Sequence, residues 1–360
     1  MAVEAAQRQE DEAPEVEEPI STALLIDELR IELGYGLLSL INDTRGHRLT
    51  DQIKALRRQI AGDMGFIMPS VRILDNMQLP ASIYALRIKE VEAGRGDLRP
   101  DKLLVMDPQG GAIDLQGEAT TEPTFNLPAM WVEETLREEA SFRGYTVVDP
   151  PTVVTTHLTE VLRDNMADLL SYAATQRLLD DLPHEHHKLV EDVVPAQLSV
   201  TAVQRVLQRL LSERISIRDL PTILEGIAEA VGFTQNVVQI AEHVRARLAR
   251  QISHASTSMN GYIPLVPLAP EWEQDFAEAI IGQGDEMQLA MAPTKLQEFI
   301  GRIREVFDEL VNQGEIPVLL CSPAARPYVR SIIERIRPLT PVLSQNEIHP
   351  SAKIHTLAQI

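Results

Sequence analysis

Cysteine, aromatic residues and long apolar runs are all scarce in this sequence of 360 residues. The single cysteine, Cys321, excludes a disulfide within the chain and suits a reducing compartment. Aromatic residues make up only 4% of the chain, so we expect its cores to be aliphatic. No run of residues approaches the ~18 apolar positions that a membrane-spanning helix needs. These absences favour a soluble protein, and the 44% hydrophobic and 24% charged residues are typical of one.

Positive charge is also in short supply. Lysine and arginine number 33 against 53 aspartates and glutamates, which gives a formal net charge of -20 at pH 7. Such a chain is repelled by nucleic-acid phosphates and by anionic membrane surfaces. We therefore expect no nucleic-acid partner, and basic or apolar protein surfaces are the partners that fit.

No nucleotide-binding or metal-binding motif is present. The phosphate-cradling loop G-x-x-x-x-G-K-[ST] does not occur, so we expect neither nucleotide hydrolysis nor a bound cofactor. His184, His186 and His187 lie beside Glu185, but their order lacks the i, i+4 histidine pair of a zinc-protease helix. We interpret this cluster as a solvated loop and predict no metal site.

Two residues are candidates for hydrolase chemistry. His157 is a candidate base, and Ser322 is a candidate nucleophile that lacks the G-x-S-x-G context. We interpret His157 as a hydrogen-bonded structural histidine, Ser322 as a strand-end serine and Cys321 as a small core residue. The sequence therefore predicts no catalytic residue, and a hydrolase that uses His157 or Ser322 is the less favoured alternative.

The N-terminal segment is strongly acidic. Residues 4–18 carry seven acidic residues against one base, Arg8, and almost no large apolar side chain. Such a segment cannot bury enough surface to fold alone, so we interpret residues 1–27 as a linker. Apolar residues return at Ile20, Leu24 and Leu25, and we expect them to dock on a neighbouring subunit. The alternative is a solvated spacer.

The remaining pattern predicts an α/β multidomain protein. Period-two alternation predicts a half-buried strand over Leu29–Leu37, and helical spacing predicts an amphipathic helix over Ile53–Ile60. Strands over Val71–Leu74 and Ile83–Val91 follow, and residues 94–100 end this sheet. The order strand, helix, strand, strand favours a sheet covered by one helix.

The stretch over residues 121–158 predicts a loop, a helix, a strand and the start of a second helix. Trp131, Leu136 and Ala140 form the inner stripe of the first helix, which Gly144 ends. A short strand follows Gly144, and an Asp-Pro-Pro corner then turns the chain into the second helix.

Residues beyond this stretch change from a helical to a mixed pattern. Helical spacing predicts one helix from Val161 toward Leu182 and further helices up to Ile252, one of which carries Val203, Val206 and Leu210 on its apolar stripe. Strands alternate with helices beyond Gly261, and one of these strands is predicted over Pro317–Leu320. The polar segment His254–Gly261 joins the two regions, and we expect it to act as a hinge.

Several words of the sequence occur, in the same order, in the cytoplasmic half of the flagellar and virulence type III export-gate family. They are E-P-T-F (122–125), G-Y-T-V-V (144–148), V-T-T-H-L (154–158), ERISIRDLPTILEGIAE (213–229) and PVLLCSPAARPYVR (317–330). The chain resembles this family from Ile20 to its C-terminus, and the resemblance implies that a second domain is inserted into the first. The expected domains are an acidic linker (1–27), a split α/β first domain (28–100 plus 150–169), an inserted second domain (101–149), a helical third domain (170–253) and an α/β C-terminal domain (254–360).

The resemblance implies a binding platform rather than an enzyme. In the family, cytoplasmic parts join into a homo-oligomeric, nonameric ring at the cytoplasmic face of the bacterial inner membrane. The ring binds export chaperones with their flagellar cargo, the export ATPase complex and its stalk, and the membrane components of the gate. A membrane half precedes this region in the family, so we expect the chain to be a cytoplasmic fragment. The words in MGFIMPSVRILDNMQL (64–79) favour the flagellar branch, and the export gate of a virulence injectisome is the alternative.

The resemblance also implies a hydrophobic dimple that takes the chaperones. The residues that match it are Met106, Pro108, Glu122, Pro123, Phe125, Leu127, Val148 and Thr156. Glu122 stands where an aspartate is common, and Asn126 stands where a glycine is common and is expected to alter the tilt of the loop. Apart from the resemblance, an aromatic in a polar, proline-flanked loop is costly unless a partner covers it. The alternative is that Phe125 fills the core of its own domain.

Overall fold

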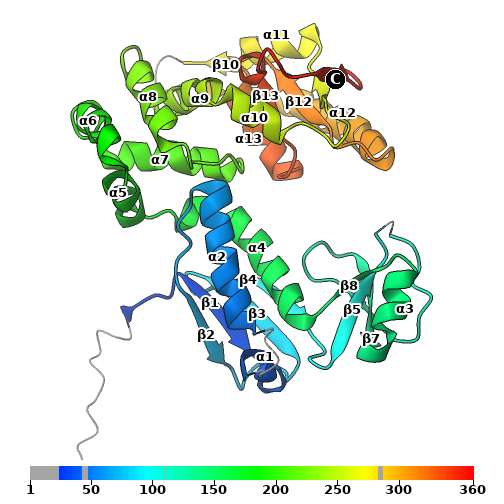
Figure 1. The fold of residues 1–360 in the computed structure, drawn as a ribbon. Coiled ribbons are helices and arrows are strands. Elements are labelled where there is room, and N and C mark those ends of the chain that lie inside the picture. The colour runs from blue at the N-terminus through cyan, green and yellow to red at the C-terminus, as the bar shows by residue number, and fades with distance from the viewer. Residues whose placement is uncertain (1–23, 43–47, 109, 283–286) are drawn as a thin grey trace, which may run out of the picture. The chain divides into compact units, whose positions relative to one another are not determined.

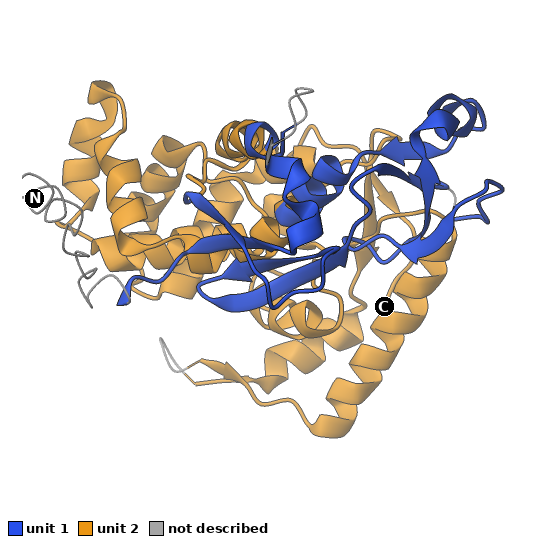
Figure 2. Ribbon diagram, turned by 90° about the horizontal axis from the view of Figure 1, so that it is seen from below, with its two compact units in different colours: residues 1–52, 69–158 blue, residues 53–68, 159–360 orange. Residues whose placement is uncertain are grey.

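The structure is a computed structural model that describes residues 24–42, 48–108, 110–282 and 287–360. Its elements are labelled in Figure 1, and Figure 2 colours the two compact units into which the chain divides. Unit 1 consists of residues 1–52 and 69–158, and unit 2 consists of residues 53–68 and 159–360. The helices α2 (Leu49–Met64) and α4 (Pro150–Leu169) contribute residues to both units. Among the described helices, none is long and apolar enough to cross a membrane.

The first sheet of unit 1 has four strands in the order β2-β1-β3-β4. β1 runs parallel to β2 and antiparallel to β3, and β3 and β4 form a hairpin. Its core is mainly aliphatic, as expected: Leu29, Ile31 and Leu33 of β1 are fully buried, together with one aromatic, Tyr84 of β3. The strands are β1 (Leu29–Leu33), β2 (Val71–Asp75), β3 (Ile83–Ile88) and β4 (Val91–Asp97).

The predicted strand over Leu29–Leu37 is too long. It ends at Leu33, and the 3-10 turn η2 (Tyr35–Leu37) and the short helix α1 (Ser39–Asn42) follow. At Gly34 the backbone runs so close to Pro80 that a Cβ atom would lie 2.1 Å from the Pro80 carbonyl oxygen. Gly34 lies at a position of the predicted alternation where a polar residue is expected. The structure shows that a glycine is needed there because it permits this close approach.

The predicted single strand over Ile83–Val91 is also wrong. The chain reverses at Lys89 and Glu90, whose φ angles of 47° and 71° are both positive. Two successive positive φ angles are typical of the two-residue turn that matches the twist of a hairpin. Gly94 and Gly96, which were expected to end the sheet, lie inside β4 and pair with β3.

The second sheet of unit 1 is antiparallel, in the order β6-β7-β5-β8. Trp131 lies on its strand β7 and not on a helix, which corrects the prediction. Trp131 and Val132 are buried from opposite faces of a strand that is paired on both sides, so pairing and β propensity decide the local structure. Gly144 does end the following helix, with φ of 82°. The elements are β5 (Lys102–Met106), β6 (Glu118–Thr121), β7 (Pro128–Glu133), the 3-10 turn η3 (Glu134–Leu136), α3 (Arg137–Phe142) and β8 (Thr146–Val148).

The helical part of unit 2 follows the predicted apolar stripes. In α7 the side chains of Val203, Val206 and Leu210 are fully buried, as the spacing predicted. The predicted helix from Val161 toward Leu182 is instead two helices, because Ser171 accepts a hydrogen bond from the Ala174 amide and starts a new one. The helices are α5 (Tyr172–Asp180), α6 (His184–Val193), α7 (Val200–Ser212), α8 (Leu220–Val231), α9 (Val237–Arg247) and α10 (Ala249–Ala255).

The C-terminal part of unit 2 is a parallel α/β sheet in the order β13-β12-β9-β14. Its core is not purely aliphatic, since Trp272, Phe276 and Phe299 stack edge to face and are buried together. The scarce aromatic residues are thus partly concentrated in one core. The elements are β9 (Ile263–Pro267), α11 (Pro270–Ala279), β10 (Ile280–Ile281), β11 (Gln288–Leu289), α12 (Pro293–Asn312), β12 (Val318–Cys321), α13 (Arg326–Ile336), β13 (Val342–Ser344), the 3-10 turn η5 (Gln345–Glu347) and β14 (Ile354–Thr356).

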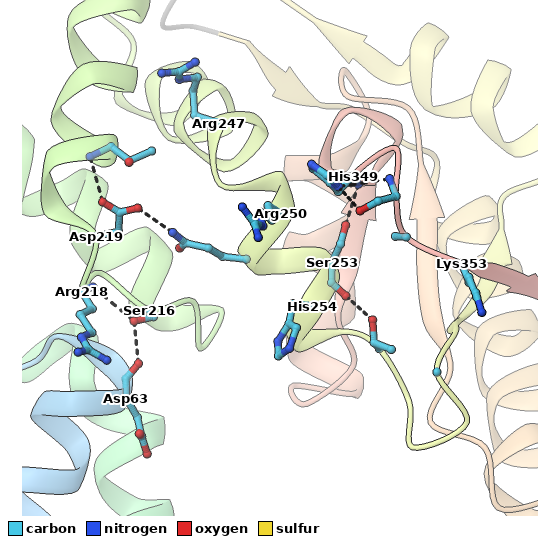
Figure 3. A pocket seen from close by; sticks show the side chains of 16 residues that line it. Asp63, Ser216, Arg218, Asp219, Arg247, Arg250, Ser253, His254, His349 and Lys353 are labelled. Carbon is cyan, nitrogen blue, oxygen red and sulfur yellow. Dashed lines mark hydrogen bonds between the residues drawn. The ribbon is translucent and has the colours of Figure 1, made fainter.

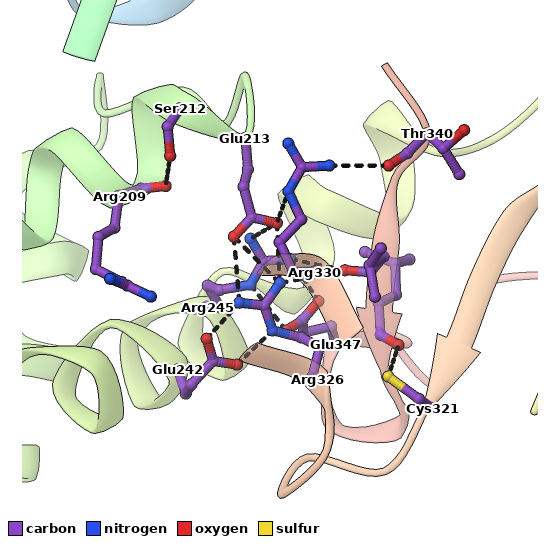
Figure 4. A network of polar contacts seen from close by, with 12 residues as sticks. Arg209, Ser212, Glu213, Glu242, Arg245, Cys321, Arg326, Arg330, Thr340 and Glu347 are labelled. Atoms are coloured by element: carbon purple, nitrogen blue, oxygen red, sulfur yellow. Dashed lines mark hydrogen bonds and ion pairs between the residues drawn. The ribbon is translucent and has the colours of Figure 1, made fainter. Parts of the chain in front are cut away.

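A buried network of ion pairs connects the helical part of unit 2 to this sheet (Figure 4). Arg245 of α9 pairs with Glu213 at 3.0 Å and with Glu347 at 2.8 Å. Arg326 at the start of α13 pairs with Glu213 at 2.9 Å and also with Glu242 of α9. Both arginines are at most 2% exposed. The network spans the predicted hinge His254–Gly261, so movement there would break buried ion pairs and is costly.

Candidate docking site

The loop between β6 and β7 is organised by Glu122, which is only 4% exposed. Its carboxylate accepts hydrogen bonds from the Thr124 amide at 2.8 Å and from the Phe125 amide at 2.7 Å. Its backbone pairs with Leu127 and Asn126, at 2.9 Å and 3.1 Å. Glu122 is therefore a buried residue that fixes the loop, and not a charge exposed on the rim of the dimple. The aspartate that the resemblance implies at this position is also a residue whose carboxylate accepts hydrogen bonds from backbone amides two and three residues later.

Asn126 holds the position where the resemblance implies a glycine. Its φ is 56°, in the left-handed region that glycine adopts without strain. Among other residues, asparagine is one of the few that visit this region readily. The substitution therefore keeps a glycine-like backbone, and the altered loop tilt that we expected has no cause in this conformation.

Phe125 projects from this fixed loop into the open. Its side chain is 56% exposed, and Leu127 is 42% exposed, while Pro123 is half-buried. An aromatic side chain that is more than half exposed does not fill the core of its own domain. The alternative interpretation of Phe125 as a core residue is wrong, and an apolar anchor is left available to a partner.

The other residues expected at the dimple lie on three elements of unit 1. Met106 at the end of β5 pairs in register with Ala129, directly after the loop. Leu104 pairs with Val148, so Met106 and Val148 face the same side of the sheet. That side is opposite to the Leu103, Val105, Val132 and Ala140 cluster under α3. Met106 and Val148 are half-buried, and so is Thr156 on α4, whereas Pro108 is exposed.

A buried polar pair lies close to Glu122. The Tyr84 hydroxyl and Nδ1 of His157 are 2.8 Å apart, and Tyr84 is fully buried. Burial lowers the pKa of His157 below its usual value, and the charge of Glu122 opposes this only in part. Burial also raises the pKa of Tyr84, and the charge of Glu122 raises it further. His157 is therefore a neutral, hydrogen-bonded structural histidine, as the sequence predicted, and Tyr84 is the partner that sequence reasoning missed.

The other candidates for chemistry have structural roles as well. The Ser322 amide donates to Glu273 at 2.8 Å, and its hydroxyl accepts from the Ala325 amide in the turn before α13. Cys321 is buried, which raises the pKa of its thiol and makes it unreactive. Both predictions are confirmed.

The histidine cluster was assigned to the wrong structure. His184, His186 and His187 lie in the first turn of α6 and not in a loop, and the ring of His187 contacts the Leu182 carbonyl. Pro183 directly precedes the helix as its N-cap residue. Across the described residues, no group of three or more His, Cys, Asp or Glu side chains is arranged to hold a metal ion.

The expected subunit-docking residues are partly visible. Leu24 and Leu25 are 78% and 73% exposed at the start of the described chain, while Ile20 lies outside the described residues. Two neighbouring leucines with this exposure are free to contact another surface.

Comparison with known proteins gives a consistent result. The model of the FHIPEP family matches residues 1–353 of the chain. The flagellar biosynthesis protein FlhA of Caulobacter vibrioides is 58% identical over 344 residues, a match that covers 96% of this chain and 49% of the relative. The chain thus spans about half the length of the curated relatives it matches.

Solved structures show the same fold. The Chlamydia pneumoniae CdsV protein is 25% identical, with a TM-score of 0.83 over 93% of this chain and 98% of that one. The structure of the Chlamydia pneumoniae CdsV and CdsO complex matches with a TM-score of 0.81 at 25% identity, over 93% of this chain and 97% of the matched chain.

Proposed function

Since this chain belongs to the FHIPEP family, we propose that it is the cytoplasmic docking platform of the flagellar type III protein export gate. In this role it receives export chaperones with their flagellar cargo, at the cytoplasmic face of the inner membrane, and passes the cargo to the membrane channel. The identity of 58% to a flagellar biosynthesis protein supports the flagellar gate over the gate of a virulence injectisome. A binding platform is also consistent with the structural roles of His157, Ser322 and Cys321, the three candidates for chemistry.

The observation that carries docking at the dimple is an exposed aromatic on a loop that is already fixed. Phe125 is 56% exposed, while its own backbone amide donates a hydrogen bond to the buried Glu122 carboxylate. A partner that covers Phe125 gains the burial of an aromatic ring without having to order the loop first. The proposed chaperone site therefore consists of Phe125 and Leu127 as anchors, with Met106, Pro108, Pro123, Val148 and Thr156 around them and Glu122 beneath.

Self-association is the second part of the proposal. Leu24 and Leu25 are exposed directly after the acidic segment, and their burial on a neighbouring subunit would remove apolar surface from water. We place Ile20 in the same contact. Repeated around a closed ring, one such contact per subunit holds the platform together.

The remaining partners follow from the family and from one solved complex. CdsV, which has the same fold as this chain, has been solved together with CdsO. By analogy this chain binds a soluble partner in the export ATPase complex and its stalk, as well as the membrane components of the gate.

The test compares two exposed phenylalanines of unit 1. Phe125→Ala removes the proposed anchor, and Phe142→Ala is the matched control because Phe142 is 93% exposed on α3. Titration of a flagellar chaperone–cargo complex onto each variant by calorimetry should show a loss of ~2 kcal/mol or more for Phe125→Ala, typical of a buried aromatic anchor. The control should bind like the natural chain, and both variants should melt at its temperature, since neither side chain is buried. Equal affinities of the two variants would remove the dimple from the proposal.

A further inference from the structure

A polar cleft in unit 2 is lined by more positive than negative side chains (Figure 3). The cleft has a volume of about 1110 Å³. The cationic side chains among the described residues of its lining are Arg218, Arg247, Arg250 and Lys353. The carboxylates of the lining are those of Asp63 and Asp219. Since the formal net charge of the whole chain is -20, the cleft locally reverses the sign that dominates the protein.

Two walls of the cleft are joined by Ser253 of α10, which is only 3% exposed. Its hydroxyl donates to the Glu347 carbonyl at 2.9 Å and accepts from the His349 amide at 2.8 Å. Nδ1 of His349 accepts in turn from the Ser351 amide at 3.3 Å, so the neutral ring carries its hydrogen on Nε2. The segment before β14 is therefore held against α10, and His349 is a donor in the lining.

The two carboxylates of the lining do not neutralise its cations. Asp219 accepts from the Thr222 amide at 3.3 Å with one oxygen and from the side chain of Gln251 at 2.8 Å with the other. It thereby ties the start of α8 to α10. The carboxylate of Asp63 is directed away from Arg250 in Figure 3. Both carboxylates thus leave the cations of the cleft available.

Three of the cations are available to a ligand. Arg218 donates to the Gly62 carbonyl at 2.9 Å, which positions the side chain and leaves its charge uncompensated. In the part of the chain that the structure describes, neither Arg250 nor Lys353 forms an ion pair with a carboxylate. Arg247 is the exception, because it pairs with two glutamates outside the lining. The three available cations come from three segments, which precede α8, form α10 and precede β14.

We propose that this cleft binds a condensed-phosphate anion, that is, a small soluble molecule with two or more phosphate groups linked in series. Arginine and lysine are the usual donors to phosphate oxygens, and the tetrahedral phosphate group accepts hydrogen bonds from several directions. A planar carboxylate is served by a single arginine, whereas cations on three segments suit an anion whose charge is spread along a chain. Because hydrogen bonds already join the segments, the ligand does not have to order them.

The composition of the lining indicates which part of the ligand is recognised. Among its described residues, only Ala352 has a purely aliphatic side chain, and none is Phe, Tyr or Trp. Small-molecule pockets are usually lined by such apolar side chains, and nucleobases are commonly held by stacking on them. The cleft therefore recognises the phosphate chain and not an attached base. It lies in unit 2, so it is separate from the proposed chaperone site in unit 1 and does not depend on it.

Calorimetric titration of the full chain with inorganic triphosphate at low salt tests the proposal. Arg250→Gln with Lys353→Gln should weaken the affinity by about tenfold or more, since two charged donors are lost. The control, Lys188→Gln with Arg304→Gln, removes the same charge from α6 and α12 of unit 2, outside the lining, and should bind like the natural chain. All four side chains are exposed, so both variants should melt at the natural temperature. Equal weakening in the two variants, or no saturable binding of triphosphate, would overturn the proposal.

A series of ligands then identifies what the cleft recognises. Orthophosphate should bind much more weakly than triphosphate, because one phosphate group cannot reach cations on three segments. An ATP affinity equal to that of triphosphate means that the free chain is sufficient, and a higher one means that a nucleotide supplies it; both support the site. Orthophosphate that binds as tightly as triphosphate would reveal a site for any small anion and refute the proposal. Displacement of triphosphate by an equal concentration of a peptide of seven glutamates would do the same, since it would assign the cleft to acidic protein segments.

Discussion

Removal of the Arg326 side chain should lower the free energy of unfolding of unit 2 more than removal of any exposed arginine side chain. Arg326 is 1% exposed, and its guanidinium pairs with Glu213 at 2.9 Å and with Glu242, and donates to the Val342 carbonyl at 3.3 Å. In Arg326→Met these partners stay buried with fewer cations around them. Breaking a buried ion pair from one side typically costs ~3 to 5 kcal/mol, because a charge is left uncompensated. We expect a loss of that size in the free energy of unfolding at pH 7.

The pH dependence gives the prediction a second, independent readout. Burial alone would raise the pKa of Glu213, but the Arg245 and Arg326 guanidiniums outweigh it and hold that pKa below its usual value. A lowered folded-state pKa stabilises the natural chain above the unfolded value of about 4.3, and this contribution is lost as the pH falls through the folded-state pKa. Without Arg326 the pKa of Glu213 rises. The stability difference between variant and natural chain should therefore shrink as the pH falls from about 4.3 toward the lowered folded-state pKa of Glu213.

The assay is urea unfolding followed by tryptophan fluorescence. The two tryptophans lie in different units, so Trp131→Phe in every sample leaves Trp272 to report on unit 2. Arg302→Met is the control, because Arg302 pairs at 2.8 Å with Glu305 on the exposed face of α12, and exposed pairs contribute little. If Arg326→Met unfolds at the same urea concentration as the control, or if its deficit grows as the pH falls, the account of the network is wrong.

Three further predictions concern unit 1 and assembly. Glu122→Gln should weaken chaperone–cargo binding by about tenfold in calorimetry, because the buried group that accepts from the Thr124 and Phe125 amides loses its charge. Glu122→Asp should retain most of the affinity, and equal affinities of the two variants would contradict the role of the carboxylate. Asn126→Val should destabilise unit 1 by ~1 to 2 kcal/mol in urea unfolding followed at Trp131, because a β-branched residue is strained at φ of 56°, and Asn126→Gly should not. Deletion of residues 1–27 should leave a folded chain that sediments as a monomer where the full chain forms rings, and rings of the truncated chain would exclude Leu24 and Leu25 from the contact.

Local patterns predicted much of the fold because local physics decides those elements. The apolar stripe of α7, the strand β12 and the glycine with positive φ after α3 could all be read directly from spacing and residue type. The element around Trp131 could not, since its strand pairs with β5 and β6 through residues up to 31 positions apart in the sequence. Gly34 shows the same limit, because only the position of Pro80 reveals why glycine is needed there.

The candidate docking site divides in the same way. The sequence by itself determined that an aromatic residue sits in a polar, proline-flanked loop, and the words around it indicated the family. Only the tertiary structure decided that Phe125 stays 56% exposed and that Glu122 is buried beneath it. The E-P-T-F spacing does contain a signal for this role, since an acid can accept from amides two and three residues later. Whether it does so, or faces solvent as a rim charge, depends on what packs around its carboxylate, and burial is a property of the assembled fold that no local pattern carries.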